Sequence, residues 1–474
     1  MIKIKSIKFK DHKILGEKLE LDFCDKDGNP VDTIIIAGEN GTGKTTVLNE
    51  IEKILTYQYY KSVSYEIIND NIFKCIDEKF YKDDSEIKVE IDSGESIEEN
   101  LVEFKNSSNF TAPLFAAVNI NFSPNDKIKN VGASILDLDD EERKKFTENT
   151  AENLKQLFVD ITNSDYKTKA DKYDEIIQNG KIPDKNLPLK IDRFKNAFDD
   201  MIKNLKFKGI ESKDGNIEIL FEKNGKEISI DDLSSGEKQI VVRGAFLLRD
   251  KSALNGAVVL IDEPEISMHP KWQEKILDYY RNLFVDGDKK QTSQIIISTH
   301  SNFVIEKALE LDNSIIIALQ ENNDKPKKIM KNDGTFILPS VTAAEINYNV
   351  FDIASIDYHI QLFGYLQSLM ENKLSKKMGK KINMDIKKVD DKIKNNQSLL
   401  SKNVLQDSQG NACQWSYKKT TYDTICCFIR NAIDHPEYLS NQTKTEYTKA
   451  DLRYSIEILI ELINLVKQNK LNLS

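Results

Sequence analysis

The sequence predicts an α/β fold, in which a mixed sheet with flanking helices carries a helical insertion and precedes a mostly helical C-terminal domain. Three observations favour it. Apolar, β-branched runs typical of buried strands recur at 33–37, 257–261 and 294–297. Residues 136–206 show helical spacing of their apolar positions. From about residue 340 the patterns are helical to the end of the chain.

A chain of 474 residues is too long for one compact core, so several lobes are expected. We expect an N-terminal lobe with a phosphate-binding loop at 1–130 and a helical insertion at 131–206. A second lobe with further polar motifs is expected at 207–340. The helical C-terminal domain would then occupy 341–474.

The composition is that of a soluble and rather polar protein. Hydrophobic residues make up 39% and charged residues 30% of the chain, and no apolar run approaches the ~20 residues that cross a bilayer, so no membrane contact is expected. The five cysteines follow no disulfide pattern, which indicates a reducing, cytoplasmic location. The formal net charge of −10 argues against a wholly basic nucleic-acid coat, although it allows a local basic groove.

The N-terminal part of the chain predicts strands and one helix. Residues 2–10 and 18–23 predict two strands that lead toward the first apolar run. A helix is expected from 47 to about 60. A mixed lobe over 60–110 and another buried strand at 114–120 complete this part of the chain.

The first apolar run leads directly into a phosphate-binding loop. Residues 38–45 read Gly-Glu-Asn-Gly-Thr-Gly-Lys-Thr, which fits the pattern of a glycine, four residues and Gly-Lys-Thr. Backbone N–H groups of such a loop point at phosphate oxygens, and the following helix adds its positive end. Lys44 would neutralise the β- and γ-phosphates, and the Thr45 hydroxyl would ligate Mg²⁺. The expected nucleotide contacts here are Asn40, Gly41, Thr42, Gly43, Lys44, Thr45 and Thr46.

A predicted hairpin over 216–230 leads to a second motif, Leu-Ser-Ser-Gly-Glu-Lys-Gln at 233–239. A serine-glycine turn at a helix start is an anion-binding nest, here without a lysine placed to grip phosphates. Alone, this pattern is usually only a helix N-cap. Because a strand with an acidic end comes next along the chain, Ser234, Ser235, Gly236 and Glu237 become candidate nucleotide contacts.

The next two strands end in polar residues. The strand at 257–261 runs into Asp262, which would hold Mg²⁺ through water, and Glu263, which would polarise the attacking water. The strand at 294–299 ends at His300, which could contact the γ-phosphate. The alternative is that the acids end a strand in solvent and that the histidine is structural. The candidate catalytic residues are Glu263, His300 and Lys44.

These four motifs occur in the order seen in ABC/SMC-type ATPases, and the chain resembles the soluble OLD and RecF-type branch over 1–55, 113–125 and 205–320. The resemblance implies an ABC-type P-loop ATPase head with ATP and Mg²⁺ as cofactors. It also implies that ATP is sandwiched between two copies of the chain. Ser235 and Gly236 of one copy would close over the γ-phosphate held by Lys44 of the other.

The C-terminal part carries two further patterns, after a last strand pair expected at 314–319 and 336–338. Lysines crowd 373–395, which indicates either a solvated helix or a patch that faces nucleic acid. Residues 424–437 resemble the Arg-Asn-x-x-x-His signature of HEPN ribonucleases. That resemblance implies a ribonuclease site of Arg430, Asn431 and His435; the alternative is a helix end where these side chains make structural contacts.

Taken together, the patterns resemble the PtuA-type ATPases of Septu and retron-linked anti-phage systems. This resemblance implies a dimer or higher homo-oligomer that closes around ATP and scaffolds or regulates a separate HNH nuclease. Two alternatives stay open. One is an ATP-gated HEPN ribonuclease, similar to anticodon nucleases that act on tRNA. The other is an SMC/RecF-like DNA-repair ATPase, although no long heptad pattern is present.

Overall fold

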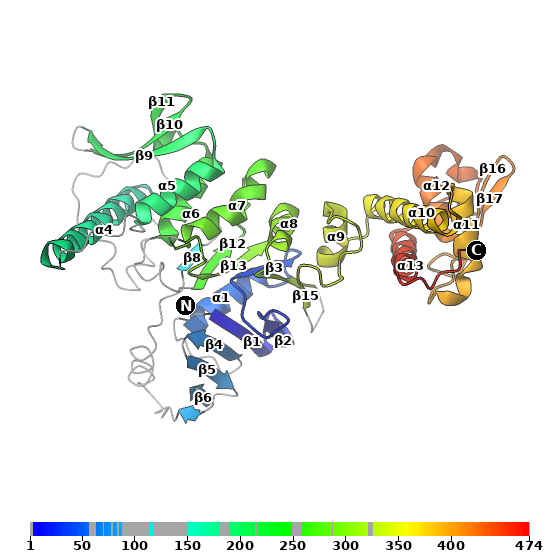
Figure 1. Cartoon of the computed structure of the whole chain (residues 1–474), viewed down its shortest axis with the longest axis horizontal. Helices are drawn as coiled ribbons and strands as arrows, with labels where there is room; N and C mark the ends of the chain where they lie inside the picture. The colour runs from blue at the N-terminus through cyan, green and yellow to red at the C-terminus, as the bar shows by residue number, and fades with distance from the viewer. Residues whose placement is uncertain are drawn as a thin grey trace. The chain divides into compact units, whose positions relative to one another are not determined.

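In the computed structural model (Figure 1), the chain forms two compact units, residues 1–331 and 332–474. The four-part division expected from the sequence is finer than this and stays a prediction. The structure describes residues 3–55, 63–69, 71–76, 79–82, 85–87, 114–116, 150–179, 189–213, 216–248, 258–286, 288–320 and 326–473.

A six-stranded mixed sheet lies at the centre of the first unit, in the order β15-β14-β3-β13-β12-β8. Neighbouring strands run parallel except β15, which is antiparallel to β14. The strands are β3 (Thr33–Gly38), β8 (Leu114–Ala116), β12 (Val258–Asp262), β13 (Gln294–Thr299), β14 (Ser314–Leu319) and β15 (Lys327–Ile329). Since the carboxyl ends of parallel strands share one edge, the residues that follow β3, β12 and β13 are brought together there.

Helices flank this sheet, as its buried strands require. Every residue of β3, β12, β13 and β14 is buried, which explains their β-branched runs. Val47, Leu48 and Ile51 of α1 pack into one core with Ile34 and Ile36 of β3. The helices are α1 (Lys44–Leu55), α6 (Ser235–Leu247), α7 (Pro270–Leu283) and α8 (Asn302–Glu310) (Figure 1).

A second sheet of the first unit has the order β2-β1-β4-β5-β6-β7 and is antiparallel throughout. It comprises β1 (Lys3–His12), β2 (Gly16–Asp22), β4 (Val63–Asn69), β5 (Asn71–Ile76), β6 (Lys79–Lys82) and β7 (Ser85–Ile87). The predicted strand pair at 2–10 and 18–23 is confirmed. Within the expected mixed lobe at 60–110, the described residues are all strands.

The insertion and the hairpin form one cluster of aromatic side chains. An antiparallel sheet of β9 (Leu205–Lys213), β10 (Asn216–Lys223) and β11 (Lys226–Ser229) lies beside two helices. Helix α4 (Thr150–Asn179) packs against β10, and α5 (Lys190–Met201) packs against β9. Five phenylalanine rings pack at centroid distances of 5.2 to 5.6 Å: Phe158, Phe194, Phe198, Phe207 and Phe221. The helical insertion and the hairpin are therefore both confirmed where the structure describes them.

The second unit is mostly helical, as predicted. It comprises α9 (Ala343–Phe351), α10 (Ile356–Met378), α11 (Ile386–Asn395), α12 (Ile425–Asp434) and α13 (Lys449–Lys467), with a hairpin of β16 (Trp415–Tyr417) and β17 (Thr420–Tyr422). Its own core joins α10, α12 and α13. Within the part of the chain that the structure describes, no helix has the length and apolarity needed to span a membrane.

The strand expected at 336–338 is wrong. The antiparallel partner of β14 is β15, and residues 336–338 are irregular. Their backbone groups have another partner, because the N–H groups of Ile337 and Leu338 donate to the buried Glu345 carboxylate at 2.6 and 3.1 Å. A side chain from α9 therefore satisfies donors that a sheet would otherwise have paired.

Candidate functional site

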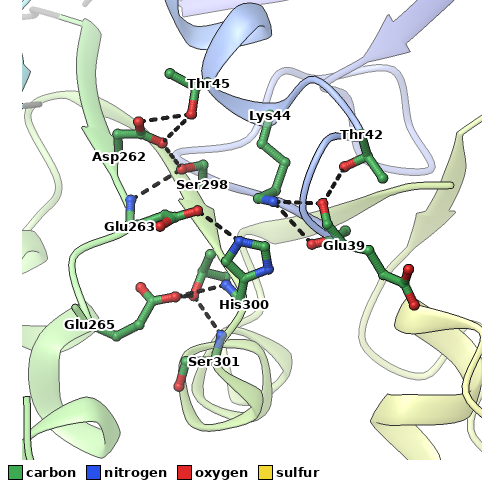
Figure 2. A network of polar contacts seen from close by, with 12 residues as sticks. Glu39, Thr42, Lys44, Thr45, Asp262, Glu263, Glu265, Ser298, His300 and Ser301 are labelled. Atoms are coloured by element: carbon green, nitrogen blue, oxygen red, sulfur yellow. Dashed lines mark hydrogen bonds and ion pairs between the residues drawn. The ribbon is translucent and has the colours of Figure 1, made fainter. Parts of the chain in front are cut away.

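The phosphate loop lies between β3 and α1, with Lys44 folded back onto it (Figure 2). The Lys44 ammonium donates to the carbonyl oxygens of Gly38 at 3.1 Å and Glu39 at 3.0 Å, and it is buried. Burial lowers the pKa of Lys44, and the nearby carboxylates of Glu263 and Asp262 oppose that shift. The loop therefore presents a buried cation whose hydrogen-bond partners are backbone carbonyls.

Two glycines of the loop are required by its geometry. A Cβ atom at Gly38 would lie 2.6 Å from the carbonyl oxygen of Leu319 and 2.7 Å from Thr42 Oγ1. Gly43 has a φ of +90°, and a Cβ atom there would lie 2.6 Å from a methyl group of Leu15. The first glycine of the sequence motif thus allows a close approach that a side chain would block, and the last glycine adopts a backbone conformation that residues with a side chain rarely adopt.

The end of β12 places a carboxylate against the start of α1. Thr45 Oγ1 donates to Asp262 Oδ2 at 2.9 Å, and the Ser298 hydroxyl from β13 donates to the other carboxylate oxygen (Figure 2). Asp262 is buried. A hydroxyl and a carboxylate are hard oxygen ligands of the kind that Mg²⁺ prefers, so these residues fit a magnesium ion bound beside phosphates.

Glu263 and His300 come together at the ends of β12 and β13. Glu263 Oε1 lies 2.7 Å from His300 Nε2, and both side chains are partly exposed (Figure 2). Glu263 has a φ of +43°, a left-handed conformation that costs a residue with a side chain about 1–2 kcal/mol. Its N–H donates to the Ser298 carbonyl at 3.1 Å, and its own carbonyl accepts from the buried Arg243 at 3.2 Å. Strained backbone held by its surroundings is common at functional sites.

Three residues of this site were not assigned from the sequence. Glu265 accepts hydrogen bonds from Thr299 Oγ1 and from the backbone N–H of His300, both at 2.7 Å. Burial raises the pKa of Glu265 against those two bonds. Arg243 holds the backbone after β12, and Ser298 holds Asp262. Arg243 and Ser298 are polar residues inside otherwise apolar runs, and this feature of the sequence could have identified them.

The serine turn starts α6 as a helix cap. The Ser234 hydroxyl accepts from the Glu237 N–H at 3.4 Å, and the Glu237 carboxylate accepts from the Ser234 N–H at 2.8 Å. Glu237 is buried and pairs with Lys223 at 2.8 Å. Ser234 and Ser235 are exposed, whereas Gly236 packs against Trp272. Among the described residues, no hydrogen bond or ion pair joins this turn to the phosphate loop.

The C-terminal motif is spread over the end of α12. Arg430 pairs with Asp434 one turn along the helix. Asn431 is buried, and His435 follows the helix as its C-cap, with its Nδ1 3.7 Å from Glu437. Within the described residues, Arg430 and His435 share no hydrogen bond or ion pair. A ribonuclease role for these residues stays a prediction.

The lysine-rich segment is partly paired. Lys387 lies within 3.1 Å of Asp390 and 2.9 Å of Asp391, and Lys394 lies 2.7 Å from Asp423. The pair with Asp391 is typical of a solvated helix surface, whereas Asp390 is buried. A nucleic-acid-facing role for 373–395 stays a prediction.

Residues 34–306 match the protein family described as "AAA domain, putative AbiEii toxin, Type IV TA system". The chain belongs to this AbiEii-type AAA family. The matched range of the AbiEii-type AAA family includes the phosphate loop, the serine turn, Asp262, Glu263 and His300.

Individual relatives agree with this family. The chain is 26% identical over 388 residues to "Retron Vc95 probable ATPase" from Vibrio cholerae serotype O1 biovar El Tor, covering 64% of this chain and 71% of the relative. It is 29% identical over 104 residues to "Retron Ec83 probable ATPase" from Escherichia coli, which is 20% of this chain and 18% of that one. The predicted resemblance to retron-linked ATPases is confirmed.

A solved structure similar to this AbiEii-type AAA chain is the Smc head domain with an extended coiled coil, bound to the C-terminal domain of ScpA, derived from Pyrococcus furiosus. The sequences are 14% identical, the TM-score is 0.38, and the match covers 69% of this chain and 96% of the other. The mixed sheet with flanking helices and the mostly helical C-terminal unit confirm the predicted fold class.

Proposed function

We propose that this chain binds ATP with Mg²⁺ at the site around Lys44 and hydrolyses ATP to ADP and phosphate. One observation supports this most: two polar pairs, Thr45–Asp262 and Glu263–His300, meet at the same sheet edge as the buried Lys44 (Figure 2). Phosphoryl transfer to water needs a cation at the phosphates, oxygen ligands for a metal and a group that orients water. This edge offers all three.

The phosphate-binding part would be the loop and the first turn of α1. Lys44 would exchange the carbonyls of Gly38 and Glu39 for phosphate oxygens, and burial makes a charged partner more favourable. The loop would contribute through Asn40, Gly41, Thr42 and Gly43, and the helix through Thr45 and Thr46. Mg²⁺, when bound, would neutralise charge on the phosphates; Thr45 and Asp262 would hold it.

Glu263 would act as the general base. Its carboxylate would accept a proton from the attacking water, and His300 would hold that carboxylate in place or contact the γ-phosphate. The left-handed backbone of Glu263 fixes the direction of its side chain at the sheet edge. Arg243 supports that backbone from the interior.

The serine turn would act on the ATP of a second copy. Ser234 and Ser235 are exposed at the N-terminus of the 13-residue helix α6, where backbone N–H groups favour an anion. We propose that these serines and Gly236 close over ATP held by the partner, which gives a homodimer or a higher oligomer. Glu237 would position the turn through its hydrogen bond to Ser234.

The biological output would be control of a partner nuclease of the HNH type in cytoplasmic anti-phage defence. The retron names of the two relatives support this setting. The described cysteines Cys24, Cys413, Cys426 and Cys427 are free, which fits a reducing compartment. Incubation of the purified chain alone with tRNA and with phage DNA tests the need for a partner. Robust cleavage of either substrate by the chain itself would contradict the proposal that a partner nuclease is needed.

The ATPase proposal is tested with two variants. Lys44→Ala should abolish ATP binding, because the buried cation is lost, whereas Glu263→Gln should bind ATP and lose hydrolysis. ATP binding is measured by titration calorimetry and turnover by phosphate release. Lys10→Ala, an exposed lysine of the same unit, is the matched control and should behave as the natural chain does. Normal hydrolysis by both test variants would overturn the assignment.

A further inference from the structure

The second unit exposes a group of aromatic rings beside the end of α12. The Tyr417 ring lies parallel to the His435 ring at 7°, with centroids 6.3 Å apart, and Tyr438 lies 5.2 Å from Tyr417. Tyr417 is 40% exposed, Tyr438 37% exposed, and the His435 side chain 54% exposed. Single exposed aromatic side chains need no explanation, whereas three that lie together on one surface indicate a binding site.

Two lysines stand at the same place, in the turn of the hairpin β16–β17. The turn consists of Lys418 and Lys419, because Tyr417 pairs with Thr420 across the ladder. Lys418 has a φ of +57°, where hairpin turns usually have glycine or asparagine. Its ammonium lies 5.1 Å from the centre of the Tyr417 ring. The turn therefore places one lysine beside the Tyr417 ring and a second lysine next to it in the sequence.

The acidic side chains near the turn leave its two lysines available to bind a ligand. Asp434 is paired with Arg430, and Glu437 lies beside His435. Among the described residues, Lys418 and Lys419 take part in no ion pair. Asp434 therefore already has a cationic neighbour, while the turn presents two exposed positive charges next to the rings.

We propose that Tyr417, Lys418, Lys419, His435 and Tyr438, the Tyr417 surface, bind single-stranded nucleic acid. Unpaired bases stack on exposed aromatic rings, and cationic side chains contact the phosphates between them. An acidic peptide would need the lysines but would gain little from three exposed rings. A duplex keeps its base faces stacked inside, so it would contact the lysines alone.

This surface lies in the second unit, and its binding does not depend on the proposed ATPase activity. His435 acts here as a stacking platform and not as a proton donor or acceptor. Binding is therefore expected without cleavage, and both single-stranded DNA and single-stranded RNA should bind, because every base has a face that can stack.

The test uses the full chain and fluorescein-labelled dT20 and rU20, with affinity measured by fluorescence anisotropy at low salt. Tyr417→Leu should weaken binding at least about fivefold, since one stacked base contributes about 1–3 kcal/mol. Tyr417→Phe keeps the ring and should bind as the natural chain does. Tyr166→Leu is the matched control: Tyr166 is 64% exposed with Lys169 5.8 Å from its ring centre, but it lies in the first unit.

Competition experiments and a further variant distinguish single-stranded nucleic acid from a duplex and from an acidic peptide. A dA20·dT20 duplex and polyglutamate should compete at least tenfold less well than unlabelled dT20. A Lys418→Ala, Lys419→Ala double variant should reduce the salt dependence of binding by about the contribution of two phosphate contacts. Failure of both oligonucleotides to bind, unchanged binding by Tyr417→Leu, or equal competition by the duplex or by polyglutamate would each overturn the proposal.

Discussion

Glu263 Oε1 and His300 Nε2 lie 2.7 Å apart at the ends of two neighbouring parallel strands, and a different buried residue supports each of them. Arg243 donates to the backbone carbonyl of Glu263, and Glu265 accepts from the backbone N–H of His300. The contact between the two side chains is thus set by the backbone on both sides. Residues held in this way are expected to act as one unit.

A double-mutant cycle on this pair should be strongly non-additive. Glu263→Gln alone should slow ATP hydrolysis about 10²–10⁴-fold, the usual contribution of a general base. Adding His300→Ala to it should cost little more, because the group that His300 positions is already lost. Single-turnover phosphate release with saturating ATP measures each corner of the cycle. Fully additive losses would show that the two side chains act separately.

Asp262→Asn should separate metal binding from nucleotide binding. The neutral amide still accepts a hydrogen bond from Thr45 but loses the charge that attracts Mg²⁺, so the Mg²⁺ concentration needed for tight ATP binding should rise at least about tenfold. Titration of Mg²⁺ at fixed ATP, followed by calorimetry, measures this. Asp278→Asn, a carboxylate on α7 that pairs with Lys307, should leave the Mg²⁺ dependence unchanged.

The parts of this site that the sequence predicted are those with local signals. The phosphate loop and the strand ends at Asp262 and His300 each combine an apolar run with an adjacent polar residue. Glu265 could not be assigned in the same way, because its partners lie 34 and 35 residues further along the chain. Long-range polar contacts leave no periodic pattern.

A polar contact with the following helix explains the wrong strand. Residues 336–338 are apolar and resemble an edge strand, but Glu345 of the following helix satisfies two of their N–H groups. The Arg430–His435 signature spans a helix end, because His435 follows the last residue of α12 and its ring stacks with Tyr417. The residue at which a helix ends determines such contacts, and helix ends are the feature that a sequence pattern predicts least precisely.

Two helical glycines should respond to alanine with opposite signs. A Cβ atom at Gly244 of α6 would lie 1.9 Å from the Tyr279 hydroxyl, which donates to the Ile240 carbonyl. Gly244→Ala should therefore destabilise the first unit by about 1–3 kcal/mol through overpacking. Adding Tyr279→Phe should recover part of that loss. Urea unfolding followed by tyrosine and tryptophan fluorescence measures both.

Gly364 of α10 is the matched comparison. Apart from the neighbouring backbone of its own helix, no atom of the described residues lies within 4 Å of a Cβ placed there, and the position is exposed in a helix interior. Gly364→Ala should stabilise the second unit by roughly 0.5–1 kcal/mol through helix propensity alone. If both substitutions stabilise their units, the packing of Tyr279 against α6 is not as tight as described.

The second unit should lose stability as the pH falls below about 6.5, because His359 is buried and neutral. Burial, aided by the positive charge of Arg430, lowers the pKa of His359 to about 3, and its Nε2 lies 2.9 Å from Ser455 Oγ. The unfolded chain binds a proton at this residue below pH ~6.5, whereas the folded chain does not until about pH 3. Stability should therefore fall by about 1.4 kcal/mol per pH unit through this window and be constant above it.

His359→Gln should remove that slope, since glutamine can still bond to Ser455 but does not titrate. The measurement is the free energy of urea unfolding of the second unit between pH 7.5 and 5.5, above the range in which most carboxylates titrate. His435→Gln is the control, because its side chain is 54% exposed in the same unit, and it should retain the slope of the natural chain. A His359→Gln variant with an unchanged slope would show that another group takes up the proton, and the buried imidazole would then not be the source of the acid sensitivity.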